Sequence, residues 1–312
     1  MIELFRTPNY DFIGKRRWAY LVSVVAILVS LATMAVRGGL RYDIDFTGGT
    51  LIQVRFEQAP DIGRIRASLA KIGLGESVIQ QFGDPREYIL RIPLTSANQE
   101  EVGRRVQGAL TADPSLGKLE IRRVEFVGPQ VGRDLQLQAM YAVVAGLIGI
   151  LLYIALRFDL KGGVAAIIAV FHDVIVSLGA ISIANREFSL PVLAALLTII
   201  GFSVNDTIVA YDRLRENRGR GAPRGSTFAH MMNLAINQTL SRTVLTSLTV
   251  FFSTAILLFF GGKTLEDFAF VLFVGVVTGT YSTVYVASAI VVDWTNYVEG
   301  RIRRVKKAVA KA

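Results

Sequence analysis

The 312-residue sequence contains no cysteine and only two histidines. Without cysteine, no disulfide can stabilise the fold and no thiolate metal site can form. Two histidines also leave little for a metal cluster, so we expect no metal and no other cofactor. Charged residues make up only 19% of the chain. Long stretches without charge therefore dominate the sequence.

Those stretches indicate a membrane protein, because 52% hydrophobic residues and a mean hydropathy of +0.45 are too apolar for an ordinary soluble domain. A helix needs about 20 apolar residues to cross about 30 Å of hydrocarbon. The first such stretch follows Lys15, Arg16 and Arg17, but it is long and no small-residue cleavage site follows, so we interpret it as an uncleaved anchor. We predict a polytopic α-helical membrane protein with six transmembrane helices, at about 18–36, 136–156, 163–184, 189–212, 242–260 and 268–292.

The positions of Lys and Arg predict the orientation. With a cytoplasmic N-terminus, the inner segments hold 18 of the 34 basic residues and the two short outer loops hold two. The long outer segment is exempt from this charge rule. The N-terminal segment 1–17 and the basic tail 293–312 are therefore expected in the cytoplasm. The net charge of +9 lies mainly beside membrane ends, which favours anionic lipid headgroups over nucleic acid as its partner.

Residues 37–135 change to mixed charge with short apolar runs. Apolar residues at helical spacing predict helices after Pro60 and after Asn98. Alternating or β-rich runs predict four strands, at 51–56, 78–82, 88–94 and 119–127. The resulting order βαββαβ predicts an extracytoplasmic α+β ferredoxin-like domain after the first membrane helix, a scaffold that by itself indicates no function.

The segment DIDFTGGT leads into the first predicted strand and contains Asp45, Gly48 and Gly49. Paired glycines are typical of a turn with backbone angles that other residues avoid. The alternative is a direct contact role. A phosphate-binding loop is excluded, because the Lys-Ser/Thr end of a Walker motif and G-x-G-x-x-G spacing are both absent.

Asp206 lies inside the apolar run from Leu190 to Tyr211, next to Asn205. A carboxylate at that depth costs about 3 kcal/mol, so its presence indicates a functional site. Arg242 begins the next predicted span. Burial and an opposite charge act in opposite directions on the protonation of a carboxylate, so a small change in their separation can add or remove a proton. The alternative is a fixed ion pair that only sets packing.

His172 and Asp173 lie midway along the third predicted span and are weaker candidates for a proton pathway. Adjacent helical residues point about 100° apart, so we expect only one of the two to face the pathway. Asp212 and Arg213 continue the end of the fourth span into the cytoplasm and are typical of interfacial anchors and ion pairs.

Small and hydroxyl-bearing residues predict close helix packing. Gly275 and Gly279 form a G-x-x-x-G motif in the sixth span. One face of the fifth span is expected to look into the bundle, and it carries Arg242, Thr246, Thr249 and Ser253. The alternative for each hydroxyl is that it only joins helices.

Four blocks of sequence together resemble the SecF family of the bacterial Sec protein-export system. They are GFSVNDTIVAYDRLREN at 201–217, which contains Gly201, then NQTLSRTVLTSLTVFF at 237–252, DFTGGT near the first span and FHD in the third. The resemblance implies membership of the resistance-nodulation-division superfamily, in which six spans carry a large outer domain after the first. It also implies a multi-pass protein of the bacterial inner membrane that is a transport component and not an enzyme, with no catalytic residues.

This resemblance further implies that the chain pairs with SecD and associates with the SecYEG channel and accessory subunits such as YajC. Together with SecD it would use the proton-motive force to promote preprotein translocation after ATP-driven insertion by SecA. Family knowledge assigns proton-pathway roles to Asp206 and Arg242 and places another acidic partner on SecD. The outer domain would contact the emerging preprotein.

Other classes of function fit the sequence less well. An intramembrane aspartyl protease would use Asp173 and Asp206, but its Gly-x-Gly-Asp signature is missing, and no span contains the Gly-x-Ser-Gly of a rhomboid. The nearest alternative is a half-size proton-driven exporter of small molecules or lipids, whose outer domain would need a sizeable apolar pocket. A third is helix assembly without a transport role.

Overall fold

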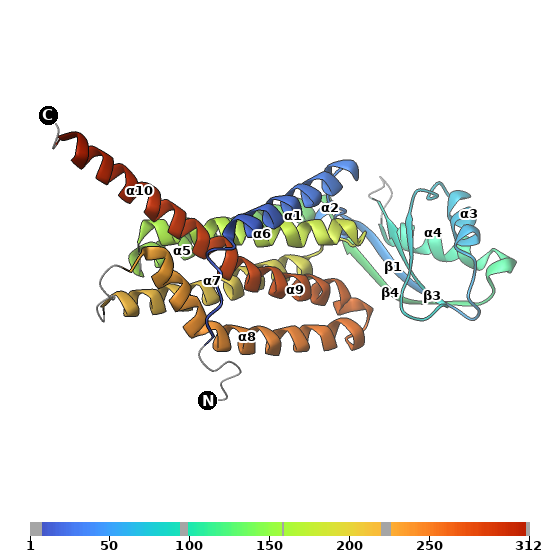
Figure 1. The fold of residues 1–312 in the computed structure, drawn as a ribbon. Coiled ribbons are helices and arrows are strands. Elements are labelled where there is room, and N and C mark those ends of the chain that lie inside the picture. The colour runs from blue at the N-terminus through green and yellow to red at the C-terminus, as the bar shows by residue number, and fades with distance from the viewer. Residues whose placement is uncertain (1–7, 94–98, 158, 220–225, 310–312) are drawn as a thin grey trace.

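The computed structural model describes residues 8–93, 99–157, 159–219 and 226–309. Within these ranges, six helices are long and apolar enough to cross a membrane, which confirms the predicted helical membrane class. A small sheet domain stands at one end of the helical bundle, and the first turn of α1 and the last turns of α10 lie at the other (Figure 1).

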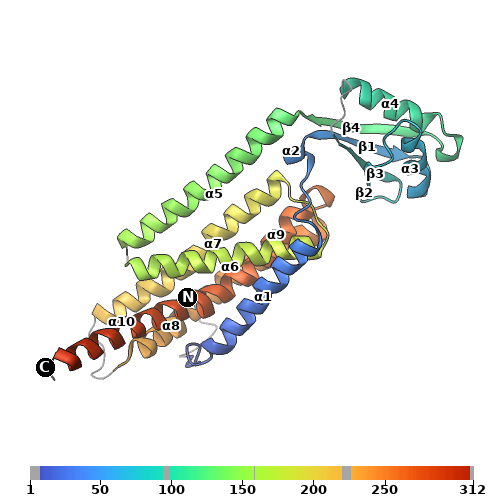
Figure 2. The ribbon, with the colours of Figure 1, turned by 90° about the horizontal axis from the view of Figure 1, so that it is seen from above.

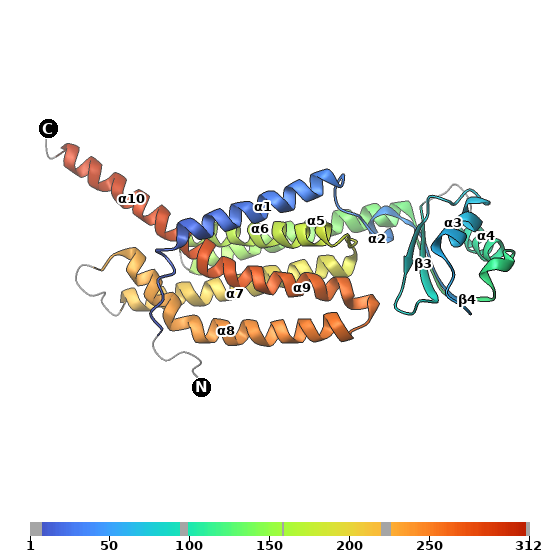
Figure 3. The ribbon, with the colours of Figure 1, turned by 45° about the vertical axis from the view of Figure 1, so that its right-hand side comes forward.

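Three central helices form the middle of the bundle and three others flank it. The central α6, α7 and α9 bury about half of their most apolar segments, whereas α5 buries almost none. Figures 2 and 3 show α1, α5 and α8 on the outside of the bundle. Large apolar side chains on these helices are exposed, among them Leu28, Ile148 and Phe259. The bounds are α1 Arg16–Val36, α5 Pro129–Arg157, α6 Leu160–Ile183, α7 Leu190–Gly219, α8 Phe228–Phe260 and α9 Lys263–Ser282, which continues through a π-helical turn, η2 Thr283–Ala287, into α10 Ser288–Val309.

The helices extend beyond the predicted spans. Helix α5 begins at Pro129, so the last residues of the predicted segment 37–135 are helical, and the described part of the tail belongs to α10. Hydropathy identifies only the apolar part of a helix, which is suited to the hydrocarbon core of a membrane. The helical hydrogen bonding of the backbone continues beyond it through polar residues. Proline is favoured at the first helical position, because its missing N–H has no intrahelical partner there. The predicted limits of the membrane segments stay predictions, since a helix end does not mark the hydrocarbon boundary.

The sheet has the strand order β2-β3-β1-β4 with every neighbouring pair antiparallel. This order is the one that a βαββαβ chain with a split βαβ arrangement produces, which confirms the ferredoxin-like fold. In the third predicted strand, 88–94, Leu94 lies outside the described residues, as does Asn98 before the second predicted helix of the domain. The strands are β1 Gly49–Phe56, β2 Val78–Gln81, β3 Glu87–Ile92 and β4 Leu119–Val127, and the helices are α3 Ile62–Ala70 and α4 Gln99–Thr111.

Apolar side chains from the strands, α3 and α4 fill the core of the sheet domain. They alternate along β1 and recur at helical spacing in both helices, as the sequence pattern predicts. The fully buried members include Ile52, Val54, Ile65, Leu69, Leu90, Val106 and Leu110. The interior of the domain is therefore closely occupied by its own side chains.

The paired glycines lie between a single helical turn, α2 Ile44–Thr47, and β1. Gly48 has φ +70° and Gly49 has φ +144°. A Cβ atom on Gly49 would lie 2.6 Å from the carbonyl oxygen of Ile92 in β3. Both the backbone angle and the contact with the neighbouring strand thus require glycine at position 49.

Candidate functional site

Asp206 lies in α7, sixteen residues after Leu190 and so about 24 Å along the helix axis. Its side chain is buried, with 3% of the residue exposed. None of the described residues forms a hydrogen bond or ion pair with it, and its Oδ2 atom is fully enclosed. A charge on this carboxylate therefore has to be compensated by a proton or by a group outside the described chain.

Arg242 lies on the neighbouring helix α8, but it does not form an ion pair with Asp206 among the described contacts. It acts on the carboxylate only through longer-range charge, and its own side chain is exposed on the surface of the bundle. The direct pairing that the sequence suggested is therefore not present in this structure.

The prediction for the interior face of α8 was wrong. The buried hydroxyl residues of this helix are Thr243, Ser247 and Thr254, and Ser247 accepts a hydrogen bond of 2.8 Å from Thr280 of α9. The residues predicted to face inward donate instead to carbonyl oxygens of their own helix, as Thr246 does to Arg242 and Ser253 to Thr249. Hydroxyl residues recur at helical spacing on both faces of α8, so spacing alone could not decide which one is buried.

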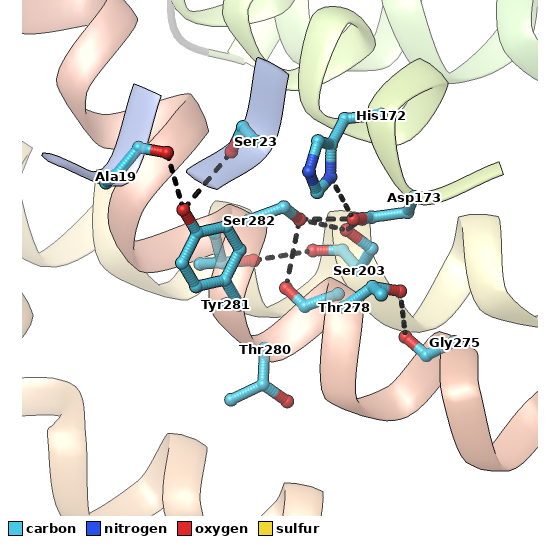
Figure 4. Close-up of polar contacts among 12 residues, drawn as sticks. Ala19, Ser23, His172, Asp173, Ser203, Gly275, Thr278, Thr280, Tyr281 and Ser282 are labelled. Carbon is cyan, nitrogen blue, oxygen red and sulfur yellow. Dashed lines mark hydrogen bonds and ion pairs between the residues drawn. The ribbon is translucent and has the colours of Figure 1, made fainter. Parts of the chain in front are cut away.

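A buried polar cluster around Asp173 joins α6, α7 and α9 (Figure 4). Asp173 is fully buried, and its Oδ2 accepts hydrogen bonds from Ser203 Oγ at 2.7 Å and Ser282 Oγ at 2.6 Å. Its Oδ1 lies 3.0 Å from Nδ1 of His172. Side-chain rotation brings the two polar groups together although the Cα–Cβ bonds of adjacent helical residues diverge. That only one of the two faces a proton pathway stays a prediction.

The π-helical turn η2 begins directly after Ser282 of this cluster. Thr283, its first residue, contacts Thr207 Oγ1 at 3.1 Å and donates to the Ser203 carbonyl oxygen at 3.2 Å. Single π turns inside α-helices occur frequently at functional sites. Neither Ser203 nor Ser282 was singled out by the sequence analysis. The spacing of Ser203, Asp206 and Thr207 along α7 is the signal that could have indicated a polar face.

Glycines allow α9 to approach α7 beside this cluster. A Cβ atom on Gly275 would lie 2.1 Å from Ile199 Cδ1, and one on Gly279 would lie 3.2 Å from Ser203 Cβ. The G-x-x-x-G pair therefore faces α7 at close range, in the manner of small residues at membrane helix contacts.

The remaining predicted residues lie apart from the buried cluster. Gly201 and Asn205 are exposed on α7. Asp212 accepts from Arg157 at 2.8 Å, and Arg213 pairs with Glu216 at 2.6 Å. These are surface contacts near one end of the bundle. No group of three or more potential metal ligands occurs in the described ranges.

The sheet domain is joined to the start of α7 by backbone and side-chain contacts. The backbone of Phe188 donates to Arg41 at 2.6 Å and accepts from Asp43 at 3.0 Å. Arg91 of β3 forms ion pairs with Asp43 at 3.0 Å and with Glu187 at 2.7 Å. The helix that carries Asp206 therefore begins in direct contact with the domain outside the bundle.

Asp45 completes this junction, because its Oδ2 accepts a hydrogen bond of 3.2 Å from the backbone N–H of Leu190, the first residue of α7. Burial raises the pKa of the Asp45 carboxyl, while the bond from Leu190 opposes the rise. The sheet domain thus supplies an acceptor for an otherwise unpaired N–H of a membrane helix.

Replacement of Asp45 should affect stability in a pH-dependent way. Asp45→Ala removes the acceptor and should lower the free energy of unfolding by about 1 kcal/mol. Asp45→Asn keeps an oxygen and removes a carboxyl whose pKa is raised in the folded state. A carboxyl whose pKa is raised by folding stabilises the folded state at low pH, and this contribution is lost as the pH rises past about 4. At neutral pH the Asn variant should therefore be at least as stable as the parent protein. Thermal unfolding of the full chain in detergent, at low pH and at neutral pH, measures this difference. An Asn variant as unstable as the Ala variant at neutral pH would contradict it.

Comparison with known proteins identifies the family. The model of the family described as protein export membrane protein SecD/SecF, C-terminal, matches residues 109–297. The chain belongs to the SecD/SecF family. The model of the SecD/SecF GG motif matches residues 38–60, which include the two glycines described above.

Curated relatives in the SecD/SecF family are similar over almost the whole chain. Protein translocase subunit SecF of Desulfurispirillum indicum is 43% identical over 304 residues, with 95% of each chain covered. That of Pseudomonas aeruginosa is 39% identical over 286 residues, covering 92% of this chain and 91% of the relative. With the six apolar helices, these relatives indicate a multi-pass protein of the bacterial inner membrane and a transport component.

Two solved structures of SecDF share the fold. SecDF of Thermus thermophilus, described as a translocon-associated membrane protein, is 40% identical with a TM-score of 0.81 over 93% of this chain. A SecDF structure in a super-membrane-facing form is 41% identical with a TM-score of 0.67 over 100% of this chain. The present chain spans 39% and 41% of those two SecDF chains, respectively.

Proposed function

We propose that this chain is a SecF subunit that pairs with SecD and uses the proton-motive force to promote preprotein translocation through SecYEG. Family membership and the SecDF structures support the SecD partnership. Accessory subunits such as YajC, a preprotein on the sheet-domain side and anionic lipids beside the basic tail complete the proposed set of partners. Both termini lie in the cytoplasm under this proposal, which rests on the distribution of Lys and Arg.

The observation that carries the proposal is a polar surface on α7 and α8 in the apolar part of the bundle. We define this polar surface by its exposed residues, Thr198, Asn205, Arg242, Thr249 and Ser253. An exposed arginine and an exposed amide are costly in contact with lipid tails. The surface therefore suits a protein partner with complementary polar groups, and an acidic residue of SecD is the partner that Arg242 would meet.

The proposed mechanism begins at Asp206. Asp206 lies within range of the charge on Arg242, and it has no hydrogen-bond or ion-pair partner among the described residues. Protonation removes the negative charge on Asp206 that attracts Arg242, so the preferred packing of α7 against its neighbours changes. Because α7 begins at the junction with the sheet domain, a shift of this helix changes the tilt of that domain.

The energy available to such a step is sufficient for a change of conformation. One proton that crosses a membrane at 100 mV releases about 2.3 kcal/mol, before any pH gradient is added. A bias of that size changes the ratio of two states by a factor of about 50.

Copurification tests the partnership. Arg242→Leu together with Asn205→Leu should reduce the recovery of SecD with this chain from detergent-solubilised membranes by about tenfold, since polar contacts between membrane helices contribute about 1 to 2 kcal/mol. Leu28→Ala is the matched control, because Leu28 is exposed on α1, on the opposite side of the bundle from α8 (Figure 1). Undiminished recovery of SecD with the double variant would count against the polar surface as the interface. Recovery of an adaptor and an outer-membrane duct in place of SecD would favour the small-molecule exporter.

A further inference from the structure

Asp173 is held as a hydrogen-bond acceptor in the middle of the bundle. Both of its oxygens are occupied, one by Ser203 and Ser282 and the other by His172. Hydroxyl and ring N–H donors stabilise a carboxylate in its charged form. Each serine has one hydroxyl proton, and the shorter contact of Ser282 is the one with Asp173 at 2.6 Å, against 3.1 Å to the Gly279 carbonyl oxygen.

His172 has one ring nitrogen in use and one free. Nδ1 lies 3.0 Å from Asp173 Oδ1, whereas Nε2 is fully buried and has no hydrogen-bond partner in the described part of the chain. The residue is 96% buried, and its ring lies against that of Tyr281, with 6.0 Å between ring centres. The Tyr281 hydroxyl is already engaged, since it donates to the Ala19 carbonyl oxygen at 2.7 Å and contacts Ser23 Oγ at 3.2 Å.

The charged surroundings leave this pair without a counter-ion. On α1, no charged residue occurs between Tyr20 and Val36, and on α6 the pair itself is the only ionisable group between Lys161 and Ile183. Of the other elements that pack against α6, helix α7 contributes one carboxyl inside its apolar run, and α9 and η2 contribute hydroxyls. Helix α10 contributes one carboxyl near its start, and this carboxyl is paired with Arg16. The titratable groups on these elements include Asp206, Tyr281, Tyr285, Tyr20 and Asp293. Helix α5 also packs against α6 and carries Tyr141 and Tyr153 in its apolar part, with Arg133, Asp134 and Arg157 towards its ends. With a neutral ring, the His172–Asp173 pair carries one uncompensated negative charge.

We propose that the His172–Asp173 pair is a second proton-binding site of the bundle, separate from Asp206. Nε2 of His172 takes the proton, and Asp173 is the positioning residue that keeps the other ring proton on Nδ1. Uptake converts a site of net charge −1 into a neutral imidazolium–carboxylate pair, which the low-dielectric interior favours. A histidine whose Nδ1–H donates to a carboxylate can in general bind and release a proton at Nε2.

The proposed site is coupled to the π-helical turn by geometry. Ser282 donates to Asp173 and is the last residue before η2, whose first residue contacts Ser203 and Thr207 of α7. A change in the charge of the pair therefore changes the strength of a bond that holds η2 in its place. This link to transport rests on the proposed function, whereas proton binding by the pair does not.

Nitrogen NMR of the full chain in lipid vesicles tests the site. The chain has two histidines, so His230→Gln leaves His172 as the only source of a labelled ring signal. At high pH the ring should carry its proton on Nδ1, and as the pH falls from about 8 to about 5 a second proton should appear on Nε2. Asp173→Asn should abolish the preference for the Nδ1 proton. Ser177→Ala is the matched control, because Ser177 is fully buried on the same helix and outside the cluster, and it should leave the signal unchanged.

Further variants keep the two proposals distinguishable. Ser282→Ala removes one donor to Asp173 and serves as a milder replacement if Asp173→Asn does not fold; it should shift the pH at which Nε2 gains its proton. In Asp206→Asn, His172 should still take up its proton even though proton-driven transport is lost. A ring that carries its proton on Nε2 throughout, or one that stays singly protonated over the whole range, overturns the second site and leaves the role of Asp206 intact.

Discussion

Asp206→Asn should abolish the acceleration of preprotein translocation by an imposed proton-motive force and leave the ATP-driven rate in place. The amide has nearly the shape of the carboxyl but neither binds nor releases a proton. At about 100 mV one proton is worth about 2.3 kcal/mol, so the loss should reach a factor of about 50 in the gradient-dependent part of the rate. Vesicles that contain the complete translocase, measured with and without the gradient, provide the test.

Asp212→Asn is the matched control for this change. Asp212 lies six residues further along the same helix, is exposed and pairs with Arg157 at 2.8 Å. An exposed ion pair contributes about 0 to 1 kcal/mol, so its loss should leave the response to the gradient almost unchanged. If Asp206→Asn vesicles still consumed the gradient and exported preprotein at the rate of the parent protein, the assignment of Asp206 as the proton site would be wrong.

Gly49→Ala should destabilise the sheet domain by about 3 kcal/mol or more. Its Cβ would lie 2.6 Å from the backbone oxygen of Ile92, and its φ of +144° is strained for any residue with a side chain. The Cβ position is fixed by the backbone of β1 and the oxygen belongs to the backbone of β3, so no side-chain rotation relieves the contact. For a domain of this size the loss should lower the unfolding temperature by at least about 10 °C. Limited proteolysis of the full chain at increasing temperature measures it.

Gly73→Ala provides the comparison for Gly49→Ala. Gly73 also has a positive φ, +78°, but a Cβ atom there would meet nothing within 4 Å. Only the backbone strain remains, about 1 kcal/mol, which corresponds to a shift of about 5 °C. Equal shifts for the two variants would show that the approach of β3 to Gly49 contributes no stability.

The sheet domain followed from the sequence because local signals agree there. Alternation along β1 and helical spacing in α3 and α4 each have a single physical interpretation, and positive-φ glycines separate the elements. The chain order of such elements leaves few topologies, so the sheet order could be predicted.

The faces of the membrane helices were harder to predict from the sequence. In soluble proteins the buried face is the apolar one, whereas a membrane helix is apolar towards lipid as well as towards its neighbours. The position of Arg242 shows the consequence, since its hydroxyl-bearing face is exposed while Thr243 and Ser247 are buried. Spacing identified one hydroxyl-bearing face of α8, and the buried hydroxyl residues lie on another.

The sequence by itself determined the class of protein, the number of apolar helices, the ferredoxin-like order of the sheet domain and the presence of ionisable groups inside apolar runs. These depend on composition and on periodicity along the chain, which tertiary packing does not alter. Only the tertiary structure decided that His172 and Asp173 act as one pair with Ser203 and Ser282, that Arg242 faces outward, and that Asp45 caps α7. Each of these contacts depends on a side-chain rotamer or on the packing of segments that are distant in the sequence. Local sequence patterns determine neither.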